Sequence, residues 1–215
     1  MLFDMDGTLV DSEGLWEIGL AELAEHYGGV LSAQTRLAMV GSDMAVTMRL
    51  LHDDLGQPWR DPEVGAAWIE RRVAELFAEG LRWRPGALAL LRAVRAVGVP
   101  TALVTSTGRN LVEIALDTLG RDSFDVVVCG DEVPATKPDP APYRMAAALL
   151  DVPIARCVAV EDSVAGVASA LAAGAAVLAV PSQVQIETAD GVHLLPDLTG
   201  ADLELLASLV ARVRP

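Results

Sequence analysis

Hydrophobic positions along the chain follow two different patterns. Up to about residue 80 they recur with helical spacing, and glycines separate three predicted helices, Glu13–His26, Asp43–Leu55 and Pro62–Glu79. After residue 85, short runs rich in Val, Leu and Ala alternate with further helical segments. Continuous apolar runs of this length are typical of strands that are covered on both faces. The pattern therefore predicts a helical region followed by an α/β region.

The α/β region contains predicted strands and helices in strict alternation. The predicted strands are Met1–Phe3, Val99–Val104, Val126–Cys129, Cys157–Val160 and Ala175–Val180, and the predicted helices are Gly86–Val97, Arg109–Leu119, Ala141–Leu150, Ser163–Ala173 and Thr199–Val213. This order predicts an α/β fold with a Rossmann-like parallel sheet, right-handed crossovers and a ligand crevice outside the carboxyl ends of the strands. Residues 1–13 and 84–215 would form this core domain, and residues 14–83 an inserted all-helical cap domain above the crevice.

Composition and charge exclude several classes of protein. A chain of 215 residues with 52% hydrophobic content can bury a substantial core, which excludes disordered chains and disulfide miniproteins. The net charge is −14, which disfavours nucleic acid and anionic membrane surfaces as partners. One uncharged stretch, 163–186, is long enough to cross a bilayer, but Gly166, Gly174 and Pro181 divide it into a helix, a turn and a short strand.

The remaining clues to location are the cysteines and the start of the chain. Cys129 and Cys157 lie in apolar runs, where a thiol behaves as a small buried hydrophobe, and we expect both to be reduced. The opening residues Met1–Asp4 lack the charged and apolar regions of a signal peptide. These features predict a cytoplasmic protein.

Polar residues follow the predicted strands. The first strand leads into Asp4-Met5-Asp6-Gly7-Thr8-Leu9-Val10-Asp11-Ser12, the second into Thr105-Ser106-Thr107, the third region into Lys137-Pro138 and the fourth into Glu161-Asp162-Ser163. In a parallel sheet these strand ends converge on one crevice. Carboxylates hold a hard cation such as Mg²⁺, while a lysine and a hydroxyl balance phosphoryl oxygens. The residues therefore predict a Mg²⁺-dependent phosphoryl-transfer site.

In order and spacing, these groups resemble the four motifs of the haloacid dehalogenase-like superfamily. The resemblance covers nearly the whole chain and is closest to the phosphatase and β-phosphoglucomutase-like branch, which carries a helical cap between its first two motifs. It implies a phosphatase that uses Mg²⁺ and an aspartyl-phosphate intermediate. The implied substrate is a small phosphorylated metabolite, with a sugar phosphate preferred, and the implied protein is a monomer.

The same resemblance implies roles for individual residues. Asp4 matches the nucleophile, and Asp6 matches the general acid and base, whose backbone carbonyl also binds the metal. Asp162 matches a further Mg²⁺ ligand, while Glu161 would reach the metal directly or through water. Lys137 matches the lysine that bridges the phosphate and the nucleophile.

Three more residues concern substrate binding. Thr105 best fits the hydroxyl that binds the transferring phosphoryl group, with Ser106 offering its backbone N–H and hydroxyl. The register between these two residues is open by one position. Trp16 either packs on a helix face or closes the crevice over a ligand.

Alternative functions are separated by single residues. Dehalogenases of the family lack the second acid of the first motif, so Asp6 argues against that chemistry. A phosphonatase would need a cap lysine, and residues 14–81 contain none. A β-phosphoglucomutase-like enzyme would place a histidine and an arginine in the cap, where this chain has Trp16 and, aligned on Gly41, Met44. A catalytically idle binding protein on the same fold is the remaining alternative, and the intact acids argue against it.

Overall fold

The computed structural model describes residues 1–39, 42, 44–182, 184–187 and 189–212. The chain divides into two compact units. The first, which we call the α/β unit, comprises Met1–Asp11 and Leu81–Pro215, and the second, the helical unit, comprises Ser12–Gly80.

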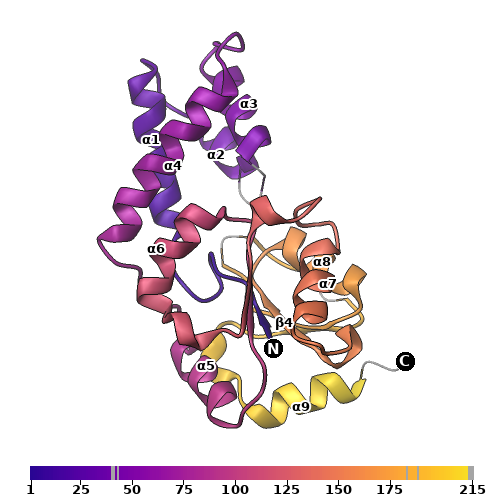
Figure 1. Cartoon of the computed structure of the whole chain (residues 1–215). Coiled ribbons are helices and arrows are strands. Elements are labelled where there is room, and N and C mark those ends of the chain that lie inside the picture. Colours follow the sequence, from indigo (N-terminus) through magenta and orange to yellow (C-terminus); the bar gives the residue numbers. More distant parts are fainter. Residues whose placement is uncertain (40–41, 43, 183, 188, 213–215) are drawn as a thin grey trace. The chain divides into compact units, whose positions relative to one another are not determined.

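The α/β unit is built on a six-stranded sheet whose described strands all pair in parallel (Figure 1). The strands are β1 (Leu2–Phe3), β2 (Ala102–Val104), β3 (Val126–Val128), β4 (Val158–Glu161), β5 (Ala176–Ala179) and β6 (Val192–Leu194), in the order β3-β2-β1-β4-β5-β6. The order reverses between β1 and β4. Such a switch point opens a crevice at the carboxyl ends of the two strands, and the predicted α/β, Rossmann-like class is confirmed.

Helices bury the sheet. Figure 1 shows α7 (Ala141–Leu149) and α8 (Val164–Ala173) together on one face, where they pack on a continuous apolar core. The remaining helices of this unit are α5 (Ala87–Ala96), α6 (Arg109–Leu119) and α9 (Leu203–Arg212), of which α9 contacts β4 and β5. Leu2 and Phe3 are both fully buried although they point to opposite faces of the sheet. Burial on both faces explains the unbroken apolar runs of the sequence.

Two predicted elements begin more than two residues later than expected, and each has a local cause. The strand predicted from Val99 starts at Ala102, because the Val99 N–H still bonds to the carbonyl of Val94 and Pro100 has no N–H for the ladder. The helix predicted from Thr199 starts at Leu203, because Leu198–Gly200 forms a separate 3₁₀ turn. Its predicted end, Val213, lies outside the described residues.

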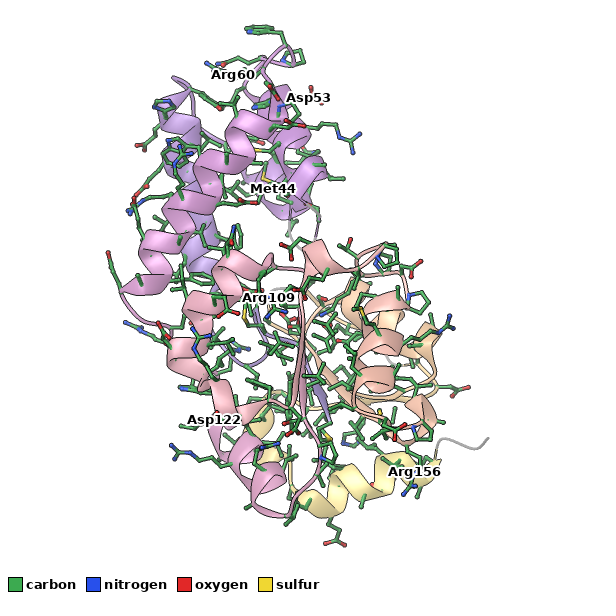
Figure 2. The ribbon with its side chains drawn as sticks, in the orientation of Figure 1. Met44, Asp53, Arg60, Arg109, Asp122 and Arg156 are labelled. Atoms are coloured by element: carbon green, nitrogen blue, oxygen red, sulfur yellow. The ribbon has the colours of Figure 1, made fainter. Side chains whose placement is uncertain are left out.

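The helical unit contains α1 (Glu13–His26), α2 (Ala33–Met39), α3 (Met44–Asp54) and α4 (Pro62–Ala78) among its described residues. Helix α4 packs against α1 and α3, and α2 packs against α3. The buried side chains at these contacts include Leu23, Met48, Leu51, Ile69, Val73 and Phe77. Figure 2 marks Met44 and Asp53 toward the two ends of α3, and Arg60 in the loop before α4. The expected start of α3 at Asp43, and the alignment residue Gly41, lie outside the described residues.

No helix in the part of the chain that the structure describes is long and apolar enough to span a membrane. The uncharged stretch 163–186 instead holds α8 and β5, joined at Gly174.

Candidate active site

Asp4 lies immediately after β1, and a rigid turn carries Asp6 close behind it. The Asp4 N–H donates to the carbonyl of Val160 on β4, 3.0 Å away, so the strand pairing extends to this residue. The chain then turns at Gly7, whose φ of 73° is a conformation that favours glycine. The Gly7 N–H donates to the Val10 carbonyl at 2.9 Å and closes the turn. Both acids are therefore placed by backbone hydrogen bonds at the switch point.

The Asp4 carboxylate is almost completely buried, at 5% exposure. Its Oδ1 accepts a hydrogen bond from Lys137 Nζ at 2.6 Å. Within the described residues, Oδ2 is buried without any hydrogen-bond partner. Burial raises the pKa of Asp4 well above its usual value; Lys137 opposes this shift, whereas Glu161 and Asp162 add to it. A cation beside Oδ2 would both satisfy this atom and favour the ionised carboxylate.

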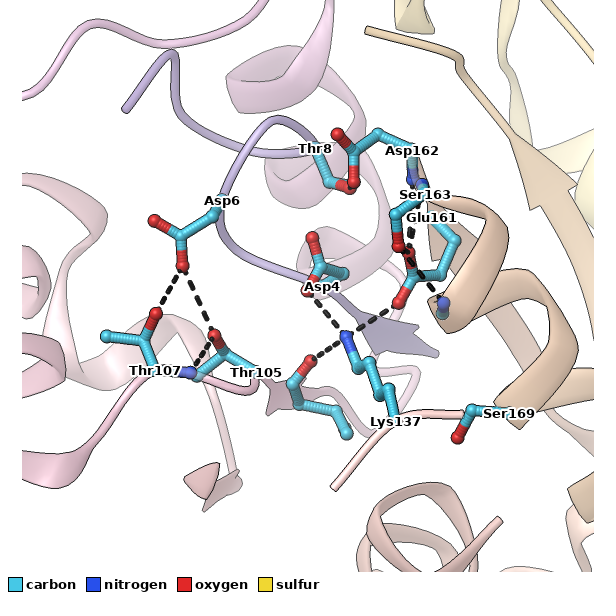
Figure 3. A network of polar contacts seen from close by, with 12 residues as sticks. Asp4, Asp6, Thr8, Thr105, Thr107, Lys137, Glu161, Asp162, Ser163 and Ser169 are labelled. Carbon is cyan, nitrogen blue, oxygen red and sulfur yellow. Dashed lines mark hydrogen bonds and ion pairs between the residues drawn. The ribbon is translucent and has the colours of Figure 1, made fainter. Parts of the chain in front are cut away.

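Lys137 is the only lysine in the 215-residue sequence. Its ammonium group donates to Asp4 Oδ1 at 2.6 Å, to Glu161 Oε1 at 2.6 Å and to the Val104 carbonyl at 2.9 Å (Figure 3). These three bonds match the three protons of a charged amine. Burial alone would lower the pKa of Lys137, but Asp4 and Glu161 together raise it above its usual value. The residue is therefore a fixed buried cation.

Glu161 is fully buried, and both of its oxygens accept hydrogen bonds. Oε1 accepts from Lys137 Nζ and from the Tyr143 hydroxyl, each at 2.6 Å. Oε2 accepts from Ser163 Oγ at 3.1 Å and from the Asp162 N–H at 3.2 Å. Gly166 makes room for this carboxylate, because a Cβ there would lie 1.9 Å from the carboxyl carbon. Burial and the neighbouring Glu161 raise the pKa of Tyr143, which keeps its hydroxyl a donor.

Asp162 is buried beside Asp4 and is also hydrogen-bonded. Its Oδ2 accepts from Ser182 Oγ at 2.5 Å, and its Oδ1 accepts from Thr8 Oγ1 at 3.3 Å. One carboxylate oxygen from each of Asp4, Glu161 and Asp162 lies within 4.8 Å of the others. An all-oxygen set with an unsatisfied atom on Asp4 fits a hard divalent cation. Both oxygens of Glu161 and both of Asp162 already accept hydrogen bonds, so Asp4 Oδ2 is the oxygen of this set that lacks a partner among the described residues.

Asp6 points to the opposite side of the turn, toward the end of β2 (Figure 3). Its Oδ2 accepts from Thr107 Oγ1 at 2.7 Å and from Thr105 Oγ1 at 3.3 Å. The Thr107 N–H in turn donates to Thr105 Oγ1 at 3.0 Å. Thr105 is buried whereas Ser106 is exposed, so the structure directs the Thr105 hydroxyl, and not that of Ser106, into this cluster.

The residues predicted from the sequence divide between the two units. Asp4, Lys137, Glu161 and Asp162 form one contiguous network in the α/β unit. Trp16 belongs to the helical unit, where its ring stands edge-on to Phe77 with centroids 6.4 Å apart. The packing interpretation of Trp16 therefore has a contact to support it.

Several network members were absent from the predicted site. Ser182 follows β5, so the strand-end reasoning that found the other groups would also have found it. Thr8 and Thr107 lie inside the polar segments already singled out. Tyr143 had no such signal, because on α7 it has the spacing of a core aromatic.

The fold and this cluster together define a Rossmann-like α/β enzyme with an acidic centre at the carboxyl edge of its sheet. Residues 1–174 match the family model for haloacid dehalogenase-like hydrolases, and the chain belongs to that family. The family resemblance drawn from the motifs is thereby confirmed.

Individual relatives extend over nearly the whole chain. The protein is 34% identical to hexitol phosphatase A of Escherichia coli over 90% of this chain and 88% of that protein. It is 30% identical to the putative phosphatase YhcW of Bacillus subtilis over 96% of this chain and 94% of that protein. Among solved structures, CbbY from Rhodobacter sphaeroides in complex with phosphate aligns with a TM-score of 0.80 and 28% identity, over 93% of this chain and 94% of that one.

Proposed function

We propose that the protein is a Mg²⁺-dependent phosphatase that hydrolyses a small phosphorylated metabolite through an aspartyl-phosphate on Asp4. The observation that carries this proposal is the Asp4 carboxylate itself. One of its oxygens is held by a buried lysine, and the other is buried without a partner in the described chain, next to two more carboxylates.

Each step follows from a named side chain. An oxygen of Asp4 attacks phosphorus, and the P–O bond to the leaving group breaks as Asp6 gives its proton to the departing oxygen. Water then attacks the phosphorus of the acyl phosphate, Asp6 takes a proton from that water, and inorganic phosphate leaves while the Asp4 carboxylate is restored. The Thr107 hydroxyl donates to the Asp6 carboxylate at 2.7 Å, and this hydrogen bond fixes the direction of the carboxylate during both transfers.

The cation would be held by Asp4 and Asp162, with the backbone carbonyl of Asp6 and with Glu161 directly or through water. When bound, Mg²⁺ supplies positive charge that offsets the charges of the phosphoryl oxygens and the nucleophile. Lys137 supplies the second positive charge, fixed against Asp4. Thr105 and the backbone N–H of Ser106 would complete the cradle for the transferring phosphoryl group.

We place substrate selection in residues 14–83, acting as a cap domain for the core formed by 1–13 and 84–215. A sugar phosphate is the preferred substrate class, supported by the similarity to hexitol phosphatase A. The two cysteines are free and buried, which agrees with the proposed cytoplasmic setting. We expect the working form to be a monomer.

A mutase is the second candidate, because a putative β-phosphoglucomutase from Thermotoga maritima shares 27% identity at a TM-score of 0.70. Against it, Met44 brings no charge to the start of α3, and Trp16 is packed on Phe77. With β-glucose 1-phosphate, Mg²⁺ and a bisphosphate primer, we expect slow phosphate release or no reaction. Rapid, primer-dependent formation of glucose 6-phosphate would favour the mutase.

The phosphatase is tested with p-nitrophenyl phosphate and then with a panel of sugar phosphates, nucleotides and phosphoglycolate. We expect hydrolysis that requires Mg²⁺, stops with EDTA and is lost in Asp4→Asn. The matched control is Asp117→Asn, which changes an exposed aspartate on α6 and should keep full activity. Complete inertness of the wild-type protein toward the panel would favour a binding protein instead.

A further inference from the structure

Tyr143 joins the polar network from the first turn of a core helix. It lies on α7 and is fully buried. Its hydroxyl donates to Glu161 Oε1 at 2.6 Å, and the same oxygen accepts Lys137 Nζ at 2.6 Å. The Lys137 nitrogen also lies 5.3 Å from the centroid of the Tyr143 ring. The side chain therefore contacts both the lysine and the carboxylate that holds the lysine.

We propose that Tyr143 is a positioning residue for phosphoryl transfer, which acts by fixing Glu161 so that the Lys137 ammonium group stays against Asp4. This proposal rests on the phosphatase function proposed above. It assigns Glu161 to the support of Lys137, in addition to any contact that Glu161 makes with the metal.

The distribution of donors around Glu161 explains why the tyrosine is needed. The start of α8 holds Oε2, through Ser163 Oγ and the Asp162 N–H. Among the described residues, Oε1 accepts from two donors, Tyr143 and Lys137. Without the hydroxyl, Lys137 would be the one remaining donor to a buried carboxylate oxygen. A carboxylate in that position attracts the ammonium group more strongly and competes with Asp4 for it.

A purely structural role for Tyr143 can be separated from this one. The ring packs in the core with Leu2, Val104 and Ala146, whereas the hydroxyl is the only part that reaches Glu161. Tyr143→Phe therefore keeps the packed ring and removes the proposed function alone. Tyr27→Phe is the matched control, because Tyr27 is the other of the two tyrosines and belongs to the helical unit.

The sequence offers a direct probe of Lys137. Because the chain has one lysine, protein labelled with ¹³Cε-lysine gives a single lysine signal by NMR. In the wild-type protein we expect one sharp signal, and in Tyr143→Phe a signal at a different chemical shift, because the ammonium group moves from Asp4 toward Glu161. Tyr27→Phe should leave the signal unchanged.

Turnover and metal binding are measured on the same three proteins. We expect Tyr143→Phe to lower kcat about 10- to 100-fold, the range for losing one buried hydrogen bond to a charged group. The KM and the affinity for Mg²⁺, measured by calorimetry, should change less than about threefold, because the hydroxyl bonds to Glu161 and not to Asp4 or Asp162, the carboxylates proposed to hold the metal. The circular dichroism spectrum should match that of the wild-type protein.

The outcomes distinguish this proposal from the proposed function. An active wild-type enzyme with unchanged kcat in Tyr143→Phe, or a Lys137 signal that keeps its wild-type chemical shift in that variant, would overturn the positioning role and leave the phosphatase intact. A loss of Mg²⁺ affinity equal to the loss of kcat would show that Tyr143 acts on the metal site, and would also overturn it. A wild-type protein that hydrolyses no phosphomonoester would overturn the proposed function, and the positioning role with it.

Discussion

Replacing Lys137 by methionine should destabilise the α/β unit strongly at neutral pH. Lys137 is buried and holds two carboxylates, those of Asp4 and Glu161, at 2.6 Å each. Methionine keeps much of the volume but leaves both acids without this cation. Removing one partner of a buried ion pair typically costs about 3–5 kcal/mol. For a domain of this size, such a loss lowers the Tm by roughly 10 °C.

The loss of stability in Lys137→Met should depend on pH, and the pKa of Asp4 determines the direction. Burial raises the pKa of Asp4 above its unfolded value, and Lys137 is the group that opposes the shift. A carboxyl whose pKa is raised on folding stabilises the fold below its unfolded pKa, and this contribution disappears as the pH rises through the folded pKa. Without Lys137 the shift is larger. The deficit of the variant should therefore be greatest at pH 7 and above, and should shrink as the pH is lowered toward 4.

The assay is urea denaturation in EDTA at several pH values between 4 and 8, followed by circular dichroism. Arg156→Met is the control, because it removes an exposed cation at the end of a 3₁₀ turn (Figure 2). A deficit below about 1 kcal/mol at pH 7 for Lys137→Met, or one that does not change with pH, would refute the reasoning.

Three further substitutions have equally definite outcomes. Asp4→Asn should fold normally and lose at least about 10³-fold in turnover, because an amide is a poor nucleophile; a verified variant that retains a tenth of the rate would contradict this. Gly166→Ala should lower the free energy of unfolding by about 1–3 kcal/mol and reduce turnover, since its Cβ would meet the Glu161 carboxylate. In the control Gly14→Ala, the added Cβ meets no atom within 4 Å, so this variant should be neutral or stabilising in urea melts. Burial lowers the pKa of His52, so the free energy of unfolding should fall as the pH drops below 6.5. His52→Leu should abolish this fall in urea melts at pH 5–7.

The elements that could be predicted from the sequence are those with long or fully buried patterns. Helices Glu13–His26 and Arg109–Leu119 have the predicted bounds, because both are long and each is followed by a glycine with positive φ, Gly28 and Gly120. One α-helix and one strand in the described part of the chain were not predicted. Helix α2 has only seven residues, most of them exposed, and β6 is an edge strand of three half-buried residues after Gly191. Neither is long enough for a period to be recognised.

In the candidate site, residues at strand ends could be predicted from the sequence, whereas a contact made by packing between distant elements could not. Asp4, Thr105 and Asp162 could be singled out because each follows a buried strand, and parallel strands bring their ends together. The bond from Tyr143 to Glu161 could not be predicted. It depends on how closely α7 and α8 approach the sheet, and that distance is set by packing across the core.

The central claim is that Asp4 carries the phosphoryl group during turnover. The most direct test mixes enzyme, Mg²⁺ and a substrate it hydrolyses, quenches with acid within the first turnover, reduces with borohydride and maps the product by mass spectrometry. An acyl phosphate on Asp4 would be reduced to homoserine at that position, and Asp4→Asn should show none. Homoserine at position 4 in the wild-type protein is the predicted result. Hydrolysis that proceeds with unmodified Asp4 at every quench time would contradict the account.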